Sequence, residues 1–224
     1  MPTIETVCFD LDNTLCVNVQ SDEEIHRELF ERVDHEPLFS VSDIRNVDPA
    51  ALPETDSKRG FYEEVYRAVT EDLAASEYTK LAETTLGLLD ETDVRFRTGA
   101  QESFQSIREH YDTVGLLTYG DPDTQRAKID QLGIESALDA AVVCGPSTDV
   151  PGKPDPEAFR TVLTELDAVP ETSIYIGDSF RGDIVGAHSV DMHTAWVPTG
   201  DIPVDPEPEP TYVLDSPAEL CEIL

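Results

Sequence analysis

The sequence predicts an α/β fold: a doubly wound parallel sheet with an inserted α-helical domain. Five short apolar runs lack the strict alternation of half-exposed strands, so they suit a parallel sheet that helices cover on both faces. Amphipathic helical patterns separate the last four runs, as expected for right-handed strand–helix–strand connections. Between the first two runs, the segment 17–97 carries helical patterns and no convincing strand. We therefore expect an α/β core domain, 1–16 with 98–224, interrupted by a helical domain, 17–97.

The α/β domain is predicted to contain three helices. The middle one begins near Pro122 and ends before Gly133, since proline is typical of the first turn of a helix and glycine of the position after its last residue. Residues 212–214 predict a last edge strand before a short terminal helix, and the proline-rich segment 198–210 predicts an extended surface loop. The predicted strands are 6–9, 113–119, 140–144, 173–176 and 193–197, and the predicted helices are 101–111, 122–132 and 156–166.

At least three amphipathic helices are predicted in the inserted segment. Ser21, with Glu24 three residues later, has the form of a capping box ahead of a first helix whose apolar positions end at Val33. The second and third helices are predicted over 61–73 and 78–89, where apolar residues recur at helical spacing.

The composition is strongly acidic, with 47 Asp and Glu residues against 15 Lys and Arg residues and a formal charge of −32. Nucleic acid and anionic membrane surfaces are therefore not expected as partners, because both bind basic patches. An acidic interaction tail is one interpretation, but the carboxylates are spread along the whole chain. Their spread, together with only four lysines, favours adaptation to a high-salt cytosol and a haloarchaeal source.

We expect a cytoplasmic protein. No stretch approaches the roughly 18 apolar residues needed to span a bilayer, and the first residues lack the basic flank and apolar run of a signal peptide. The four cysteines are too few for a disulfide scaffold and have no CxxC spacing. The sequence leaves the oligomeric state open.

The first candidate site follows the first predicted strand, in the run Asp10-Leu11-Asp12-Asn13-Thr14. Ligands of a parallel α/β sheet bind outside the carboxyl ends of its strands, so Asp10 and Asp12 lie at the expected place. One is expected to act as ligand or nucleophile and the other as acid. The alternative is chance, because two aspartates at this spacing are common in so acidic a chain, and Asp121 with Asp123 repeats the pattern at a predicted helix start.

Two further candidate sites follow the second and third strands. In Thr118-Tyr119-Gly120, a hydroxyl and a glycine turn before a helix could hold a phosphate, although an ordinary strand exit explains them as well. Lys153 lies between Gly152 and Pro154 ahead of a predicted helix, where a positive charge gains nothing from the helix dipole. The alternative for Lys153 is a solvated surface lysine.

The fourth candidate site follows the strand 173–176, where Asp178 and Asp183 accompany two glycines that let backbone approach a ligand. Carboxylates that converge at one edge of a sheet repel one another and need a cation. Hard oxygen ligands of this kind suit Mg²⁺.

Taken in chain order, the four motifs resemble those of the haloacid dehalogenase superfamily, over residues 3–16 and 98–200. The resemblance implies a Rossmann-like core, and the helical insertion lies where the type-one caps of that family lie. It also implies that Asp10 is the nucleophile that becomes an aspartyl phosphate. Asp12 would protonate the leaving oxygen and then deprotonate the water that hydrolyses this intermediate.

The same resemblance implies the remaining site residues. Asp10, the backbone carbonyl of Asp12, and Asp178 would hold Mg²⁺, and Asp183 would support them through water or by fixing Lys153. The phosphoryl group would be bound by four residues of the second and third motifs: Thr118, Tyr119, Gly120 and Lys153.

Several activities of the family remain open at this point. Family members that remove halides lack an acid at the position of Asp12, so a phosphatase acting on a small-molecule phosphate ester is favoured over a dehalogenase. A sugar-phosphate phosphomutase and a non-catalytic binding module are the alternatives. A phosphonatase would need a reactive cap lysine, and neither Lys58 nor Lys80 has a suggestive context. Tyr119 stands where the family often has Asn, so no particular substrate follows from the resemblance.

Overall fold

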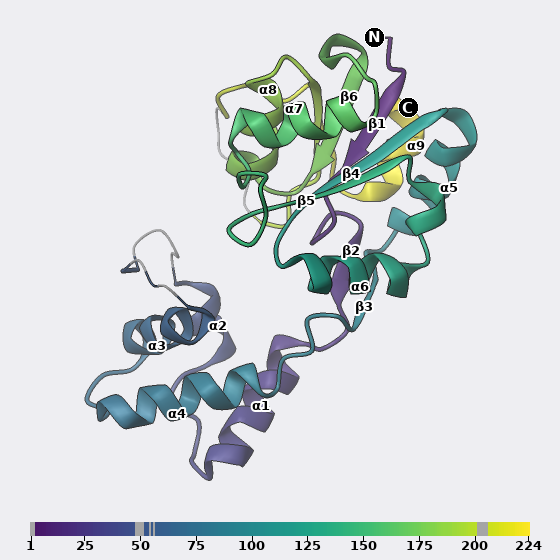
Figure 1. The fold of residues 1–224 in the computed structure, drawn as a ribbon. Helices are drawn as coiled ribbons and strands as arrows, with labels where there is room; N and C mark the ends of the chain where they lie inside the picture. Colours follow the sequence, from purple (N-terminus) through teal and green to yellow (C-terminus); the bar gives the residue numbers. More distant parts are fainter. Residues whose placement is uncertain (1–2, 48–51, 54, 56, 201–205) are drawn as a thin grey trace. The chain divides into compact units, whose positions relative to one another are not determined.

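The computed structural model describes residues 3–47, 52–53, 55, 57–200 and 206–224. The chain divides into two compact units, which we call the α/β unit, Met1–Asn18 with Thr92–Leu224, and the helical unit, Val19–Glu91 (Figure 1). The division falls two residues later than the expected first boundary and six residues earlier than the second. This difference assigns two short strands, β2 (Cys16–Asn18) and β3 (Val94–Phe96), to the α/β unit.

A six-stranded parallel sheet forms the centre of the α/β unit, in the order β5-β4-β1-β6-β7-β8. This confirms the predicted fold class, and every predicted strand is present to within one residue at each end. The short strand β8 lies at the sheet edge, as expected. The bounds are β1 Thr6–Phe9, β4 Thr113–Tyr119, β5 Ala140–Cys144, β6 Ser173–Gly177, β7 His193–Trp196 and β8 Tyr212–Val213.

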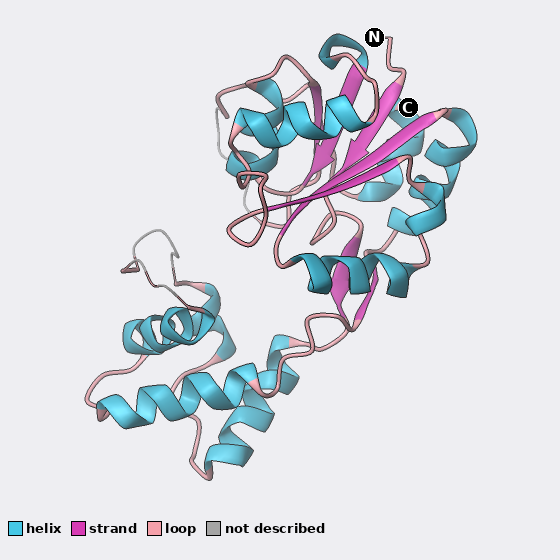
Figure 2. Ribbon diagram, in the orientation of Figure 1, coloured by secondary structure: helices cyan, strands magenta, loops and turns pink. Residues whose placement is uncertain are grey.

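Helices cover both faces of the sheet (Figure 2). Alternate residues of a strand point to opposite faces, so Val7 and Phe9 pack with residues of α5 and α6, whereas Cys8 packs with residues of α7 and α8. A π-helical turn, η4, directly precedes α8. The bounds are α5 Ala100–His110, α6 Pro122–Leu132, α7 Pro156–Glu165, η4 Phe180–Val185, α8 Gly186–His188 and α9 Leu220–Ile223. Short 3₁₀ turns occur at Glu135–Ala137, Pro170–Thr172 and Pro217–Glu219.

The helical unit contains α1 (Asp22–Val33), α2 (Val41–Arg45), α3 (Lys58–Val69) and α4 (Ala75–Leu86). The predicted capping box is present: the Ser21 hydroxyl accepts from the Glu24 N–H at 3.2 Å, and the Glu24 carboxylate accepts from the Ser21 N–H at 3.0 Å. The buried core of this unit is mainly aromatic and aliphatic, and it comprises Leu29, Phe30, Phe39, Tyr66, Tyr78, Leu81, Ala82 and Leu88.

The predicted bounds of the inserted helices need correction. Helices α3 and α4 each begin three residues before the predicted start and end before the predicted end. Ser57 caps α3 by accepting from the Gly60 N–H, and the Glu77 carboxylate caps α4 by accepting from the Ala74 N–H. Apolar spacing locates the buried face of a helix, whereas capping contacts decide where it begins.

The expectation that residues 17–97 hold no convincing strand is also wrong. Strands β2 and β3 pair antiparallel, with Cys16 opposite Phe96 and Asn18 opposite Val94. Each is three residues long, too short for alternation to be recognised in a sequence. Within the predicted loop 198–210, residues 201–205 lie outside the described part of the chain. In the described part, no helix is both long enough and apolar enough to cross a membrane.

Candidate active site

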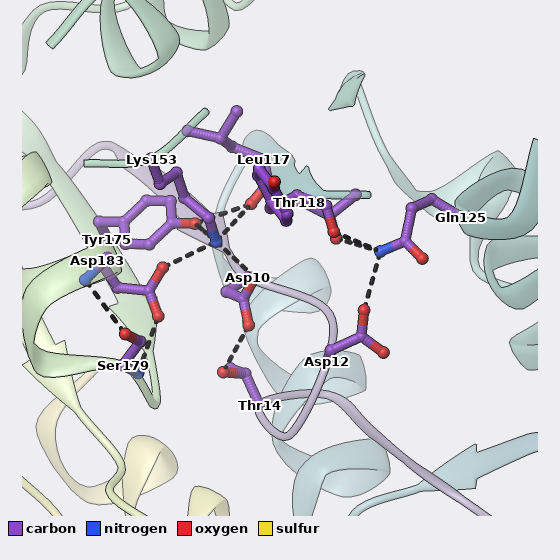
Figure 3. A network of polar contacts seen from close by, with 12 residues as sticks. Asp10, Asp12, Thr14, Leu117, Thr118, Gln125, Lys153, Tyr175, Ser179 and Asp183 are labelled. Carbon is purple, nitrogen blue, oxygen red and sulfur yellow. Dashed lines mark hydrogen bonds and ion pairs between the residues drawn. The ribbon is translucent and has the colours of Figure 1, made fainter. Parts of the chain in front are cut away.

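The loops after β1, β4 and β6 and the segment before α7 meet at the carboxyl edge of the sheet, within the α/β unit (Figure 3). They enclose a hollow of about 440 Å³. Residues from all four sequence motifs line it, and all but one have polar side chains: Asp10, Asp12, Asn13, Tyr119, Lys153, Asp178, Ser179, Gly182 and Asp183. The structure thus brings together residues up to 173 positions apart in the chain (10 to 183).

Lys153 lies at the centre of one polar network. Its Nζ lies 2.6 Å from Oδ1 of Asp10 and 2.7 Å from Oδ1 of Asp183, and it donates to Oη of Tyr175 at 3.1 Å. Only 7% of the Lys153 side chain is exposed, so a solvated surface lysine is ruled out. Burial lowers the pKa of Lys153, but the charge of Asp10 and the other acidic neighbours outweighs it, and the pKa lies well above its ordinary value.

Asp10 is held through both carboxyl oxygens. Oδ1 contacts Lys153, and Oδ2 accepts from the Thr14 hydroxyl at 3.0 Å. The Asp10 N–H also donates to the Ile176 carbonyl, which continues the β1–β6 ladder one residue beyond the strand. Burial raises the pKa of Asp10 to about 7, although the Lys153 ammonium favours the carboxylate.

Three carboxyl groups gather beside Lys153. One oxygen each from Asp10, Asp178 and Asp183 lies within 4.8 Å of the others. Burial and repulsion from Asp183 raise the pKa of Asp178 to about 6. One lysine balances only one of these three acids, and oxygen donors in excess of positive charge are what Mg²⁺ prefers. The donor set therefore fits a magnesium ion.

The segment after β6 shapes the acidic side of the site. The Ser179 N–H donates to Oδ2 of Asp183 at 2.9 Å, and the Ser179 hydroxyl accepts from the Gly182 N–H at 3.0 Å, so the turn folds back on itself. The indole N–H of Trp196 donates to the Asp178 carbonyl at 2.7 Å. Asp183 thus lies within a braced π-helical turn, a geometry frequent at functional sites, and Asp178 directly precedes its cap residue Ser179.

Asp12 belongs to a second polar network. Its Oδ1 lies 2.7 Å from Nζ of Lys128, and its Oδ2 accepts from the side-chain amide of Gln125 at 2.8 Å. The same amide donates to the hydroxyl of Thr118. Neither Gln125 nor Lys128 was among the predicted site residues. The available signal was their spacing of three on the helix that follows the second motif, which places both on one face.

The predicted phosphate-binding residues take different positions. Tyr119 is 51% exposed and lines the hollow, and its ring packs so closely on Gly152 that a Cβ there would lie 2.7 Å from it. Thr118 is buried and contacts Gln125. A Cβ on Gly120 would lie 3.0 Å from the Gln125 side chain, so the absence of a side chain at position 120 leaves room for Gln125. Among the described residues that line the hollow, Thr118 and Gly120 do not appear.

The fold and this arrangement of four motifs define a class of protein. The sequence profile of the haloacid dehalogenase-like hydrolase family matches residues 4–191, and the chain belongs to this family. The family predicted from the motifs is thereby confirmed.

The chain is similar to particular phosphatases. The chain is 31% identical to N-acylneuraminate-9-phosphatase of Homo sapiens over 174 residues, which span 76% of this chain and 68% of the human enzyme. It is 35% identical to phosphoserine phosphatase of Thermus thermophilus over 97 residues, 43% of this chain and 38% of that enzyme.

Solved structures share the whole fold. A putative β-phosphoglucomutase from Thermotoga maritima superposes with a TM-score of 0.74 at 21% identity, over 98% of each chain. The putative hydrolase YfnB from Bacillus subtilis, solved bound to magnesium, gives a TM-score of 0.73 at 21% identity over 99% of each chain. At these identities the likeness establishes the fold.

Proposed function

We propose that this protein is a magnesium-dependent phosphatase that hydrolyses the phosphate monoester of a small molecule through an aspartyl phosphate on Asp10. The main support is the setting of Asp10, which is 5% exposed, touches a buried lysine and lies within an acidic cluster that fits a divalent cation. Family membership and the relatives named as phosphatases agree with this proposal.

In the first step, a carboxylate oxygen of Asp10 attacks phosphorus as the bond from phosphorus to the leaving oxygen breaks. Asp12, which also lines the hollow, gives its proton to that oxygen. The ammonium of Lys153 lies against Asp10, where negative charge gathers on the transferred group, and stabilises it. The products are the free alcohol and a phosphoryl group on Asp10.

In the second step, water attacks the phosphorus of the aspartyl phosphate. Asp12, now a carboxylate, takes a proton from this water, and the bond from phosphorus to Asp10 breaks. Inorganic phosphate leaves, and both aspartates return to their starting states. Splitting hydrolysis into two displacements replaces one difficult step by two easier ones.

The magnesium ion would be held by Asp10, Asp178 and Asp183, with the backbone carbonyl of Asp12 as a further ligand. When bound, it supplies positive charge to the phosphoryl oxygens. Thr118 keeps a part in phosphate binding in this proposal. Its hydroxyl accepts from Gln125, which leaves the hydroxyl proton to be donated.

Two other activities are weaker candidates. A phosphomutase shares these residues, but the likeness to the Thermotoga maritima protein extends to the fold alone. A binding module without catalysis would not need its acids, yet Asp10, Asp12 and Asp178 are all present at the hollow. We further propose a cytoplasmic protein with high-salt adaptation, acting on small molecules rather than nucleic acid.

The test is hydrolysis of p-nitrophenyl phosphate in molar KCl, with and without Mg²⁺. Asp10→Asn should lower kcat by at least about 10³-fold, because it removes the nucleophile. Asp123→Asn is the matched control, since that side chain is 99% exposed and touches only Arg126 among its ion pairs in the described chain. No hydrolysis by the wild type, or an Asp10→Asn variant as active as wild type, would contradict the proposal.

The substrate is sought with a panel that includes N-acylneuraminate 9-phosphate, phosphoserine and sugar monophosphates. Release of inorganic phosphate identifies a phosphatase. Conversion of a sugar phosphate into its isomer without phosphate release would identify the phosphomutase instead.

A further inference from the structure

We propose that Lys128 and Gln125 are positioning residues for Asp12, and that their contacts hold its carboxyl group in place for proton transfer to the leaving oxygen. This inference rests on the proposed phosphatase function and adds two residues to it.

The contacts reach both oxygens of one carboxyl group. Lys128 approaches Oδ1 at 2.7 Å and Gln125 donates to Oδ2 at 2.8 Å. One contact would leave the carboxyl group free to rotate about its own bond, but two donors on separate oxygens hold its plane as well as its position. The carboxyl group of Asp12 is therefore fixed in position and orientation, although 39% of its side chain is exposed.

Both donors are themselves well held. Gln125 is 1% exposed, and only 9% of the Lys128 side chain is accessible. Helix α6 carries both of them, and Asp121 caps this helix by accepting from the Thr124 N–H. The donors thus approach Asp12 from a rigid element.

The burial of Lys128 needs an explanation, because a lysine ammonium is costly to remove from water unless it is paired. Among the ion pairs of the described residues, Lys128 pairs with Asp12. This pairing explains a buried charge at this helix position if the proton donor at the edge of the hollow needs a fixed partner.

The two neighbouring aspartates are thereby held by separate networks. Asp10 takes its contacts from Lys153 and Thr14, whereas Asp12 takes its two short contacts from α6 and a longer one, 3.9 Å, from the Cys16 thiol. Gln125 also donates to Thr118, so it connects the proton donor with the candidate phosphate-binding hydroxyl (Figure 3). A change on α6 should therefore affect proton transfer and leave the nucleophile in place.

Proton transfer matters only for some leaving groups. A dinitrophenolate departs without a proton, whereas an alkoxide is too basic to depart without one. If Lys128 and Gln125 position the donor, their loss will slow the cleavage of alkyl phosphates and spare dinitrophenyl phosphate. General damage to the fold would slow both substrates alike.

The experiment compares kcat/KM for β-glycerol phosphate and 2,4-dinitrophenyl phosphate at saturating Mg²⁺ and molar KCl. This ratio reports steps up to departure of the leaving group, so slow hydrolysis of the aspartyl phosphate does not mask the effect. Lys128→Met should lose roughly 30-fold or more with the alkyl ester and less than about 3-fold with the aryl ester. Asp12→Asn should show the same selectivity more strongly, and Lys128→Arg should recover part of the alkyl activity.

Arg126→Met is the matched control, because it removes a positive charge from the same helix at a side chain that is 73% exposed. This variant should leave kcat/KM unchanged for both substrates. If Lys128→Met fails to fold, Lys128→Gln and Lys128→Arg provide the test, because neither removes the contact of Gln125 with Thr118. Equal losses on both esters, or no loss on either, would overturn the inference. A wild type inactive on both esters would instead contradict the proposed function.

Discussion

Gly177 and Asp183 lie closer together than any side chain at position 177 would allow. A Cβ on Gly177 would collide with Oδ2 of Asp183 and would lie 2.5 Å from its Cγ. Gly177 is the last residue of β6, and Asp183 belongs to the turn that follows and pairs with Lys153. The absence of a side chain thus allows the buried carboxylate to lie directly against the end of the strand.

Gly177→Ala should therefore displace Asp183 and break its contact with Lys153. We expect a loss of about 1–3 kcal/mol in the free energy of unfolding, the usual range for overpacking, and a clear loss of activity. Denaturant unfolding and phosphatase assays measure the two effects. Gly87→Ala is the control, because the nearest atom would lie 3.5 Å from the new methyl group; it should stay within about 0.5 kcal/mol of wild type. Equal stability of the two variants would contradict the prediction.

Magnesium should stabilise the folded protein through the acidic cluster. At 100 times the dissociation constant, a ligand bound only by the folded state adds about 2.7 kcal/mol, or roughly 5–10 °C for a chain of this size. Asp178→Asn should reduce this shift, since it removes one of three clustered carboxylates. Thermal unfolding with and without Mg²⁺ at constant KCl measures it, with Asp123→Asn as control. If Mg²⁺ raises the unfolding temperature of Asp178→Asn as much as that of the wild type, the ion binds elsewhere.

Tyr66 should make the helical unit sensitive to alkali. Its hydroxyl contacts Thr85, and burial raises its pKa to about 12. A raised folded-state pKa means that the stabilisation is complete below the unfolded value of about 10 and is lost as the pH rises towards 12. The free energy of unfolding should fall by about 1.4 kcal/mol per pH unit in that window, in addition to other titrations. Tyr66→Phe should lack this component, and parallel curves for the two proteins would disprove it.

The acidic surface predicts a requirement for salt. The charge of −32 is screened over about 10 Å at 0.1 M salt and about 3 Å at 1 M. Repulsion among the carboxylates should therefore fall, and both activity and unfolding temperature should rise as KCl is raised towards molar concentrations. Maximal activity and stability without salt would contradict the halophile interpretation and leave the catalytic proposal intact.

Much of the α/β unit was predictable because residues typical of helix and strand ends mark where its elements begin and end. Helix α6 has its predicted bounds, since Pro122 starts it and Gly133 ends it in a left-handed conformation. The four motifs were found because each directly follows a strand or precedes a helix. Lys128 and Gln125 were missed because their partner Asp12 is more than a hundred residues away, and helical spacing alone does not reveal what a polar face contacts.

Strand β1 is synthesised before the helical unit, whereas its ladder partners β4 and β6 are synthesised after it. The helical unit draws its core from residues 29–88, so its core residues are all synthesised before β4. Asp10 is synthesised long before its partners Lys153 and Asp183, which lie 143 and 173 residues further along the chain. A nascent chain that ends before Asp183 therefore contains Asp10 without its complete set of partners, and the proposed mechanism requires the last motif to be translated before hydrolysis can begin.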